Sequence, residues 1–204
     1  MQPELLSFLQ FATNIGALQF GEFTLKSGRK SPYFFNTGLF NTGTKIARLG
    51  LAYAHTIVAF NIKFDMLYGP AYKGIPLVIA TSIALAEHYQ ISAPYAFNRK
   101  EAKDHGEGGI IVGSSLQGKI LILDDVISAG ISISESIHLI HHHYAEPVAA
   151  MIALDRQEHN ECHFNLPIFP ILRFTDLVDY LATQPNMDAE LHRMKLYQAQ
   201  FNDT

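Results

Sequence analysis

The chain has 204 residues, of which 48% are hydrophobic and 17% charged, a composition that excludes an intrinsically disordered protein and predicts one globular domain over residues 1–204. A net charge of -4 provides no basic field, and there is neither a signal-peptide pattern nor an apolar run of roughly 18 residues, so we expect no nucleic-acid partner, no secretion and no membrane insertion. The single cysteine, Cys162, excludes an intramolecular disulfide and favours a cytoplasmic location.

Hydrophobic periodicity predicts an alternation of helices and strands along the first half of the chain. The expected elements are, in order, a helix over 3–15, a strand within 18–28 that ends at a glycine turn, a strand over 31–36, a helix capped by Thr44 that runs to about Phe60, a strand over 64–69 that breaks into a loop at Gly69-Pro70, and an apolar helix over 75–89.

The second half continues this pattern. The expected elements are strands over 94–98, 119–125 and 147–154, a charged loop over 99–109, a helix over about 132–143, and a final part, 168–174 with helical segments 176–181 and 187–200, that closes one edge or end. Strands 119–125 and 148–154 are continuously apolar, as in parallel strands that are covered on both faces. The alternation predicts an α/β fold with a doubly wound, mostly parallel sheet flanked by helices.

An acid pair, Asp124 and Asp125, ends the strand ILILDD and is followed at once by small residues. In open α/β sheets, ligands bind beyond the carboxyl ends of the strands. The hydroxyls and N–H groups of residues 128–132, at the start of a helix, favour a phosphate dianion, and the two carboxylates are suited to accept hydrogen bonds from ribose hydroxyls. The pattern predicts a sugar-phosphate site, and taken alone it fits equally well a strand end followed by a turn.

The segment ILILDDVISAGIS at 120–132 resembles the phosphoribosyl-pyrophosphate signature of the type I phosphoribosyltransferases. Further segments resemble, in order and spacing, the orotate phosphoribosyltransferases of the bacterial dimeric kind: FGEFTLKSGRKSPYFFN at 20–36, FDMLYGPAYKGIP at 64–76, FNRKEAKDHGEGG at 97–109 and LDRQE at 154–158. The resemblance implies the type I phosphoribosyltransferase fold, with a small hood to which residues 1–40 and edge elements contribute.

This resemblance implies transfer of ribose 5-phosphate from 5-phosphoribosyl 1-pyrophosphate to N1 of orotate, which gives orotidine 5′-monophosphate and pyrophosphate in pyrimidine biosynthesis. Mg²⁺ is the implied cofactor, held mainly through the substrate and without dedicated protein ligands. A homodimer is implied as well, in which residues 99–109 form a mobile flap that closes over the site of the neighbouring subunit.

The resemblance also assigns site residues. Those implied to contact phosphoribosyl pyrophosphate are Lys26, Tyr72, Lys73, Arg99, Lys100, Lys103, His105, Asp124, Asp125, Val126, Ile127, Ser128, Ala129, Gly130, Ile131 and Ser132. Those implied to contact orotate are Phe34, Phe35, Ser128 and Arg156. Catalytic roles are implied for Lys26, Lys103, Asp124 and Asp125, and Lys103 is expected to assist the departing pyrophosphate.

The phosphate loop departs from the family, which usually has Thr-Ala-Gly-Thr where this chain has Ser-Ala-Gly-Ile at 128–131. Ile131 brings no hydroxyl, so we expect a weakened but working site unless Ser132 substitutes for it. The segment after Glu158 is also shorter than is usual in the family. We expect this shortening to change the packing of the edge and not the chemistry.

Two other functions remain open at this point. One is a phosphoribosyltransferase for a different base, against which the Phe34-Phe35 segment and Arg156 argue. The other is a regulator that senses phosphoribosyl pyrophosphate without catalysis, which is disfavoured because the chain has neither an added DNA-binding domain nor a basic face. The histidines at 138, 141, 142 and 143 are more typical of a solvated helix end than of a metal site.

Overall fold

The structure is a computed structural model that describes residues 2–25, 28–103, 109–127, 130–158 and 165–202, with the backbone alone at 102, 103 and 202. The helices are α1 (Pro3–Asn14), η1 (Thr37–Leu39, a 3-10 helix), α2 (Gly43–Ala59), α3 (Gly74–Tyr89), α4 (Ile131–His142), α5 (Phe174–Ala182) and α6 (Asp188–Asn202). The strands are β1 (Leu18–Thr24), β2 (Lys30–Phe35), β3 (Met66–Gly69), β4 (Tyr95–Lys103), β5 (Gly109–Gly113), β6 (Lys119–Val126), β7 (Glu146–Asp155) and β8 (Ile168–Arg173). Within those ranges, no helix has the length and apolarity needed to cross a membrane.

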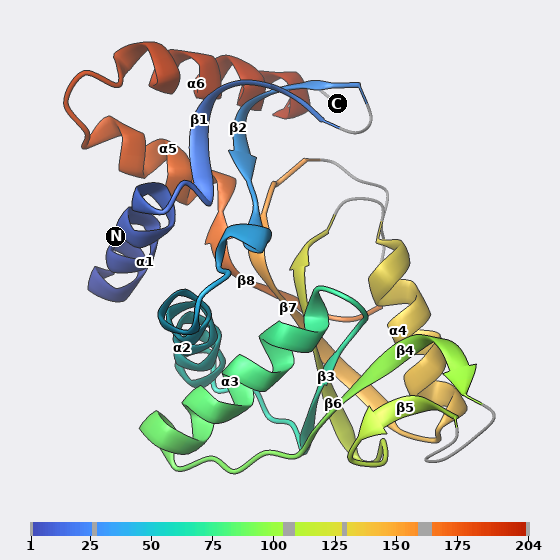
Figure 1. The fold of residues 1–204 in the computed structure, drawn as a ribbon. Coiled ribbons are helices and arrows are strands. Elements are labelled where there is room, and N and C mark those ends of the chain that lie inside the picture. The colour runs from blue at the N-terminus through green and yellow to red at the C-terminus, as the bar shows by residue number, and fades with distance from the viewer. Residues whose placement is uncertain (1, 26–27, 104–108, 128–129, 159–164, 203–204) are drawn as a thin grey trace.

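Six strands form the main sheet in the order β5-β4-β3-β6-β7-β8 (Figure 1). Strands β4, β3, β6, β7 and β8 are parallel, and β5 runs antiparallel to β4. Successive residues of β6 face opposite sides of the sheet: Leu121 and Leu123 pack into the core that includes α2 and α3, whereas Ile120 and Ile122 pack into the core that includes α4. The prediction of a doubly wound, mostly parallel sheet flanked by helices is confirmed.

A two-stranded antiparallel hairpin, β1-β2, lies beyond the carboxyl ends of β6 and β7, and α6 lies across it (Figure 1). Tyr33 of β2 is fully buried there. Its ring centroid lies 5.6 Å from that of Phe174 in α5 and 6.4 Å from that of Tyr197 in α6. This aromatic packing fixes the hairpin over the end of the main sheet at which the acid pair is expected.

Two local predictions are wrong. The cap of α2 is Thr42 and not Thr44, since the Thr42 side chain accepts a hydrogen bond from the Lys45 N–H at 3.4 Å. The charged segment 99–109 is not a loop throughout, because β4 continues to Lys103 and β5 begins at Gly109 in an antiparallel hairpin. The sequence hides this hairpin because its charged residues show no apolar alternation.

Candidate active site

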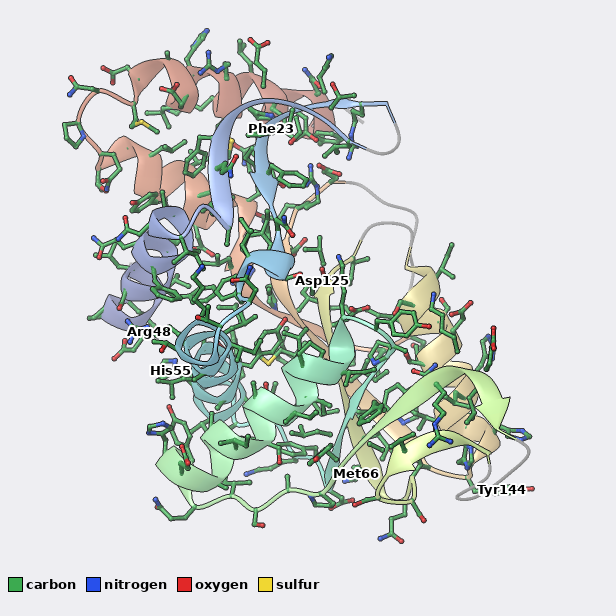
Figure 2. The ribbon with its side chains drawn as sticks, in the orientation of Figure 1. Phe23, Arg48, His55, Met66, Asp125 and Tyr144 are labelled. Carbon is green, nitrogen blue, oxygen red and sulfur yellow. The ribbon has the colours of Figure 1, made fainter. Side chains whose placement is uncertain are left out.

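The acid pair lies at the end of the main sheet that faces the hairpin, as the label of Asp125 in Figure 2 shows. Asp124 and Asp125 are 7% and 6% exposed. The N–H of Asp125 donates to Oδ1 of Asp124 at 2.9 Å, and the Tyr53 hydroxyl donates to the Asp124 carbonyl at 2.7 Å. Asp125 Oδ2 accepts a hydrogen bond from the Thr37 hydroxyl at 2.9 Å and forms an ion pair with Lys73. The Asp125 carboxylate is therefore held by the loop after the hairpin and by the loop after β3.

The two carboxylates differ in their electrostatic surroundings. Burial raises the pKa of Asp124 above its ordinary value of 3.8, and the neighbouring charge of Asp125 raises it further. The Ser132 hydroxyl, the Asp125 N–H and the charge of Lys73 favour the ionised form and oppose this shift. Asp124 is thus ionised at a cost in folding free energy, as is common for a charged group that serves function.

Asp124→Asn is expected to make the protein more stable and less active. A carboxyl group whose folded pKa lies above its unfolded pKa binds more protons in the folded state, so the wild type loses stability as pH rises through that interval, and the amide does not. We expect a gain in Tm of about 2 to 4 °C for a domain of this size. The difference in Tm between Asp124→Asn and the wild type should be larger at about pH 8 than near pH 3.8, the ordinary pKa of the group, in thermal unfolding followed by circular dichroism. An equal difference in Tm at both pH values, or a lower Tm for Asp124→Asn than for the wild type, would contradict this prediction.

A cavity of about 700 Å³ opens beside the acid pair at the start of α4. It is lined by residues of the acid-pair strand, of α4, of β4 and of the loop after β3, among them Pro70, Asn98, Arg99, Lys100, Asp124, Gly130, Ile131 and Ser132. Gly130 is the N-cap of α4, and its φ of 69° is in the left-handed region that glycine tolerates. Among the described residues no side chain caps the helix, so the N–H groups of its first turn are open to an anion.

The loop between β3 and α3 forms the opposite wall of this cavity. Its Ala71 N–H donates to the Asn98 side-chain oxygen at 2.8 Å, which joins the loop to β4. Tyr72 is 68% exposed, and the ammonium of Lys100 lies 5.3 Å from the centre of its ring. Together with the ion pair of Lys73, these contacts bring the predicted residues of the loop and of the first half of the flap to one site.

Arg156 follows β7 and reaches toward the hairpin. Its Nε donates to Glu158 Oε1 at 2.8 Å, and its Nη2 donates to the Ser31 hydroxyl at 3.2 Å and the Tyr197 hydroxyl at 3.4 Å. The guanidinium also lies 4.6 Å from the centre of the Tyr33 ring. The Arg156 side chain is 11% exposed, so its positive charge is largely buried between β7, the hairpin and α6.

Phe34 and Phe35 point to opposite faces of β2, as successive residues of a strand do. Phe35 is buried in the main core. Phe34 is 39% exposed, and its ring is stacked on that of Phe23 with the centroids 5.6 Å apart. The ring of Phe35 is therefore committed to the core, and a contact with orotate would have to use its backbone.

Some predicted site residues cannot be placed. Lys26, His105, Ser128 and Ala129 lie outside the described residues, as does most of the shortened segment after Glu158, and Lys103 is described in its backbone alone. Their proposed roles therefore stay predictions.

Sequence reasoning assigned no role to Thr37, Tyr53, Asn98 and Glu158, although each bonds the acid pair, the loop after β3 or Arg156. Glu158 and Asn98 lie inside segments that resemble the family, so their place in those segments could have identified them as candidate site residues. Thr37 and Tyr53 carry no local signal, because their contacts depend on how distant segments pack.

Comparison with known proteins agrees with this geometry. Residues 42–164 match the family model described as the phosphoribosyl transferase domain. The chain is 49% identical over 211 residues to the orotate phosphoribosyltransferase of Salmonella agona (strain SL483), with 98% of this chain and 99% of the relative covered. It is 50% identical, with the same coverage, to that of Escherichia coli O45:K1 (strain S88 / ExPEC).

Among solved structures, a crystal structure of the Francisella tularensis orotate phosphoribosyltransferase is 39% identical and gives a TM-score of 0.86, with 95% of this chain and 98% of that chain covered. The sequence motifs, the sheet with its hairpin, and relatives that match over nearly their whole length all agree. The chain belongs to the orotate phosphoribosyltransferase family.

Proposed function

We propose that the cavity beside the acid pair is the active site at which ribose 5-phosphate passes from 5-phosphoribosyl 1-pyrophosphate to N1 of orotate. The activity of the family, orotate phosphoribosyl transfer in pyrimidine biosynthesis, is the activity of this chain. One observation carries the assignment of the site: a buried acid pair lies between an open helix N-terminus and the Lys73 ammonium. These are the groups that a phosphorylated ribose with a pyrophosphate leaving group requires.

In this proposal the acid pair holds the ribose. Carboxylate oxygens accept hydrogen bonds from the two vicinal hydroxyls, and the N–H groups at the start of α4 hold the 5′-phosphate. As the bond from C1 to pyrophosphate breaks, positive charge develops on the ribose and is stabilised by Asp124 and Asp125. Lys73, together with Lys100 and Lys103 of the flap that the neighbouring subunit supplies, stabilises the negative charge that gathers on the departing pyrophosphate.

Arg156 is proposed to bind the carboxylate of orotate. A guanidinium presents parallel N–H groups that match the two oxygens of a carboxylate, a geometry that lysine cannot reproduce. The backbone of Phe34 and Phe35, together with the exposed ring of Phe34, is proposed to flank the planar base. Orotate would then lie between the hairpin and the acid pair, with N1 directed toward C1 of the ribose.

Mg²⁺ fits this site as an ion held through the substrate. The acid pair supplies the hard carboxylate oxygens that Mg²⁺ prefers, but Asp125 already accepts a hydrogen bond and forms an ion pair. Among the side chains that the structure describes, no group of three or more His, Cys, Asp or Glu could hold a metal by itself. When bound to the substrate oxygens, the ion would neutralise charge on the pyrophosphate.

We also propose a cytoplasmic homodimer in which the flap, residues 99–109, serves the site of the neighbouring subunit. The flap is carried by the hairpin of β4 and β5, which lies at one edge of the main sheet (Figure 1) and is therefore free to reach another chain. The exposure of Tyr72, next to Lys100, leaves a surface at the cavity mouth that a second subunit could cover. The cytoplasmic location is supported by the single cysteine.

A base-selectivity assay tests the proposed function. Orotate, uracil, adenine and hypoxanthine are each mixed with the protein, phosphoribosyl pyrophosphate and Mg²⁺, and the nucleotides are separated by chromatography. We expect nucleotide from orotate, because uracil and the purines lack the carboxylate that Arg156 binds. Faster reaction with a purine would overturn the choice of base, and binding of phosphoribosyl pyrophosphate with no nucleotide from any base would favour the non-catalytic regulator.

Ile131→Thr is expected to lower KM for phosphoribosyl pyrophosphate by roughly 3- to 10-fold, the net contribution of one typical hydrogen bond. Ile131 is 63% exposed at the start of α4, so a hydroxyl there would face the cavity and the phosphate. Ser132 also lies in this first turn, and its hydroxyl favours the ionised form of Asp124. Ile83→Thr, on the exposed face of α3, serves as the control in the same steady-state kinetics. An unchanged KM for Ile131→Thr would mean that the missing hydroxyl has no effect.

A further inference from the structure

Glu158 lies at the centre of a cluster that we call the Glu158 cluster: Glu158, Arg29, Arg156, Ser31 and Tyr197. The Glu158 side chain is 2% exposed. Its Oε1 accepts hydrogen bonds from Arg156 Nε at 2.8 Å and from the Tyr197 hydroxyl at 2.6 Å, and its Oε2 forms an ion pair with Arg29. Both carboxylate oxygens are thus occupied, in a setting from which water is largely excluded.

The charges of this cluster favour an anionic ligand. Two guanidiniums share one carboxylate, so the cluster keeps one net positive charge although it contains a buried acid. A buried ion pair is held rigidly when its hydrogen bonds are complete, and here each carboxylate oxygen has a strong donor. Glu158 therefore restrains Arg156 without cancelling its ability to bind an anion.

The hydrogen bonds of Arg156 also fix the orientation of its guanidinium plane. Nε is directed to Glu158, and Nη2 is shared between Ser31 and Tyr197. The face of the guanidinium lies against the Tyr33 ring. Within the described part of the chain, no acceptor is recorded for Nη1, so this nitrogen is left for a ligand.

The Tyr197 hydroxyl comes from α6, an element in which sequence reasoning found no site residue. Its ring packs against Tyr33 and against Phe201, with centroids 6.4 and 5.1 Å apart. The Phe201 ring in turn lies 5.3 Å from the guanidinium of Arg29. The C-terminal half of α6, a helix that lies across the hairpin (Figure 1), therefore covers the Glu158 cluster and supplies one of its hydrogen-bond donors.

We propose that Glu158 and Tyr197 are positioning residues that hold Arg156 in the orientation that binds the carboxylate of orotate. Through them, α6 contributes to the preference for a pyrimidine that carries a carboxylate. This inference rests on the proposed function of Arg156 as the residue that binds orotate. Both residues act through Arg156 and have no contact with the reacting atoms.

Tyr197→Phe tests the inference, because it removes the hydroxyl and keeps the ring. We expect KM for orotate to rise by roughly 3- to 10-fold, the net effect of losing one typical hydrogen bond that positions Arg156, while kcat and KM for phosphoribosyl pyrophosphate change by less than about 2-fold. Glu158→Gln should raise KM for orotate further, because it leaves two guanidiniums without a counter-charge. Tyr180→Phe, a buried tyrosine of α5, is the matched control and should change none of these values.

A double-mutant cycle with Arg156→Ala separates positioning from a general structural effect. In the Arg156→Ala background, Tyr197→Phe should no longer change KM for orotate, and the affinity for uracil, which has no carboxylate, should be the same with and without Tyr197→Phe in either background. If Arg156→Ala raises KM for orotate and Tyr197→Phe does not, the inference fails and the proposed function stands. If Arg156→Ala leaves KM for orotate unchanged, the proposed role of Arg156 fails. If Tyr197→Phe weakens the affinities for orotate and for phosphoribosyl pyrophosphate equally and also lowers Tm, its role is structural and the inference is overturned.

Discussion

Asp125→Ala is expected to lower kcat/KM for phosphoribosyl pyrophosphate by about 10²- to 10³-fold, the range found when a preorganised electrostatic group is removed from an active site. The Asp125 carboxylate accepts a hydrogen bond from Thr37 and pairs with Lys73 at the end of β6. Its removal deletes a proposed acceptor of the ribose hydroxyls and leaves the Lys73 ammonium without its partner. Steady-state kinetics at saturating orotate, with phosphoribosyl pyrophosphate varied, measure the effect.

Two further variants show whether this effect belongs to the site. Asp65→Ala removes a carboxylate at the opposite end of the sheet, where Asp65 accepts a hydrogen bond from the Lys119 N–H at 2.7 Å, and it should leave kcat/KM unchanged. Asp125→Asn keeps the shape and an acceptor for Thr37 but loses the charge, so it should lie between the wild type and Asp125→Ala. A loss in kcat/KM of less than about 3-fold for Asp125→Ala would show that this carboxylate does not stabilise the positive charge on the ribose.

Lys103→Ala is expected to lower kcat by about 10²-fold or more while KM for orotate stays near its wild-type value, because a cation that stabilises the departing pyrophosphate acts mainly in the transition state. The backbone of Lys103 pairs with Gly109 in the hairpin, where β4 ends and β5 begins. Rapid-quench and steady-state measurements give kcat and KM separately. Equal changes in kcat and in KM for orotate would exclude the leaving-group role.

Hybrid dimers test the proposal that the flap serves the neighbouring subunit. Lys103→Ala and Asp125→Ala chains are each expected to be nearly inactive, yet a mixed dimer would contain one site with an intact acid pair from one chain and an intact flap from the other. Random mixing of equal amounts should restore about a quarter of the wild-type sites. Activity that stays at the level of the separate variants after subunit exchange would show that each flap serves its own chain.

The main sheet could be predicted from the sequence because its central strands have a strong local signal. Strands β6 and β7 are continuously apolar runs, and the helices around them have clear periodicity. Strand β5 was missed because Gly109–Gly113 is short, has glycine at both ends and forms a strand through its pairing with β4. Pairing of that kind depends on neighbours in space, which a single-sequence pattern does not contain.

The residues of the candidate site also fall into those that a local sequence pattern reveals and those that it does not. Asp124, Asp125 and the start of α4 are contiguous in sequence, so a motif could identify them together. Thr37 meets Asp125, and Tyr197 meets Arg156, across long stretches of chain, and neither carries a local pattern. Such contacts are set by how the hairpin and α6 pack on the main sheet.

In the phosphate loop, residue type alone could not decide which group the Ser132 hydroxyl acts on. A serine next to Ile131 was a reasonable candidate to replace the missing hydroxyl, because both side chains lie in the first turn of α4. In the structure the Ser132 hydroxyl favours the ionised form of Asp124. The sequence therefore predicted which groups are present, while the direction of a single hydroxyl required the three-dimensional arrangement.

The central claim is that this chain joins orotate to the ribose 5-phosphate of phosphoribosyl pyrophosphate, and the fall in orotate absorbance tests it most directly. The purified protein is mixed with orotate and Mg²⁺, and the reaction is started with phosphoribosyl pyrophosphate. We predict that the absorbance falls after this addition, that pyrophosphate appears in equal amount, and that Asp125→Ala slows both. A constant orotate absorbance with the wild-type protein would contradict the account.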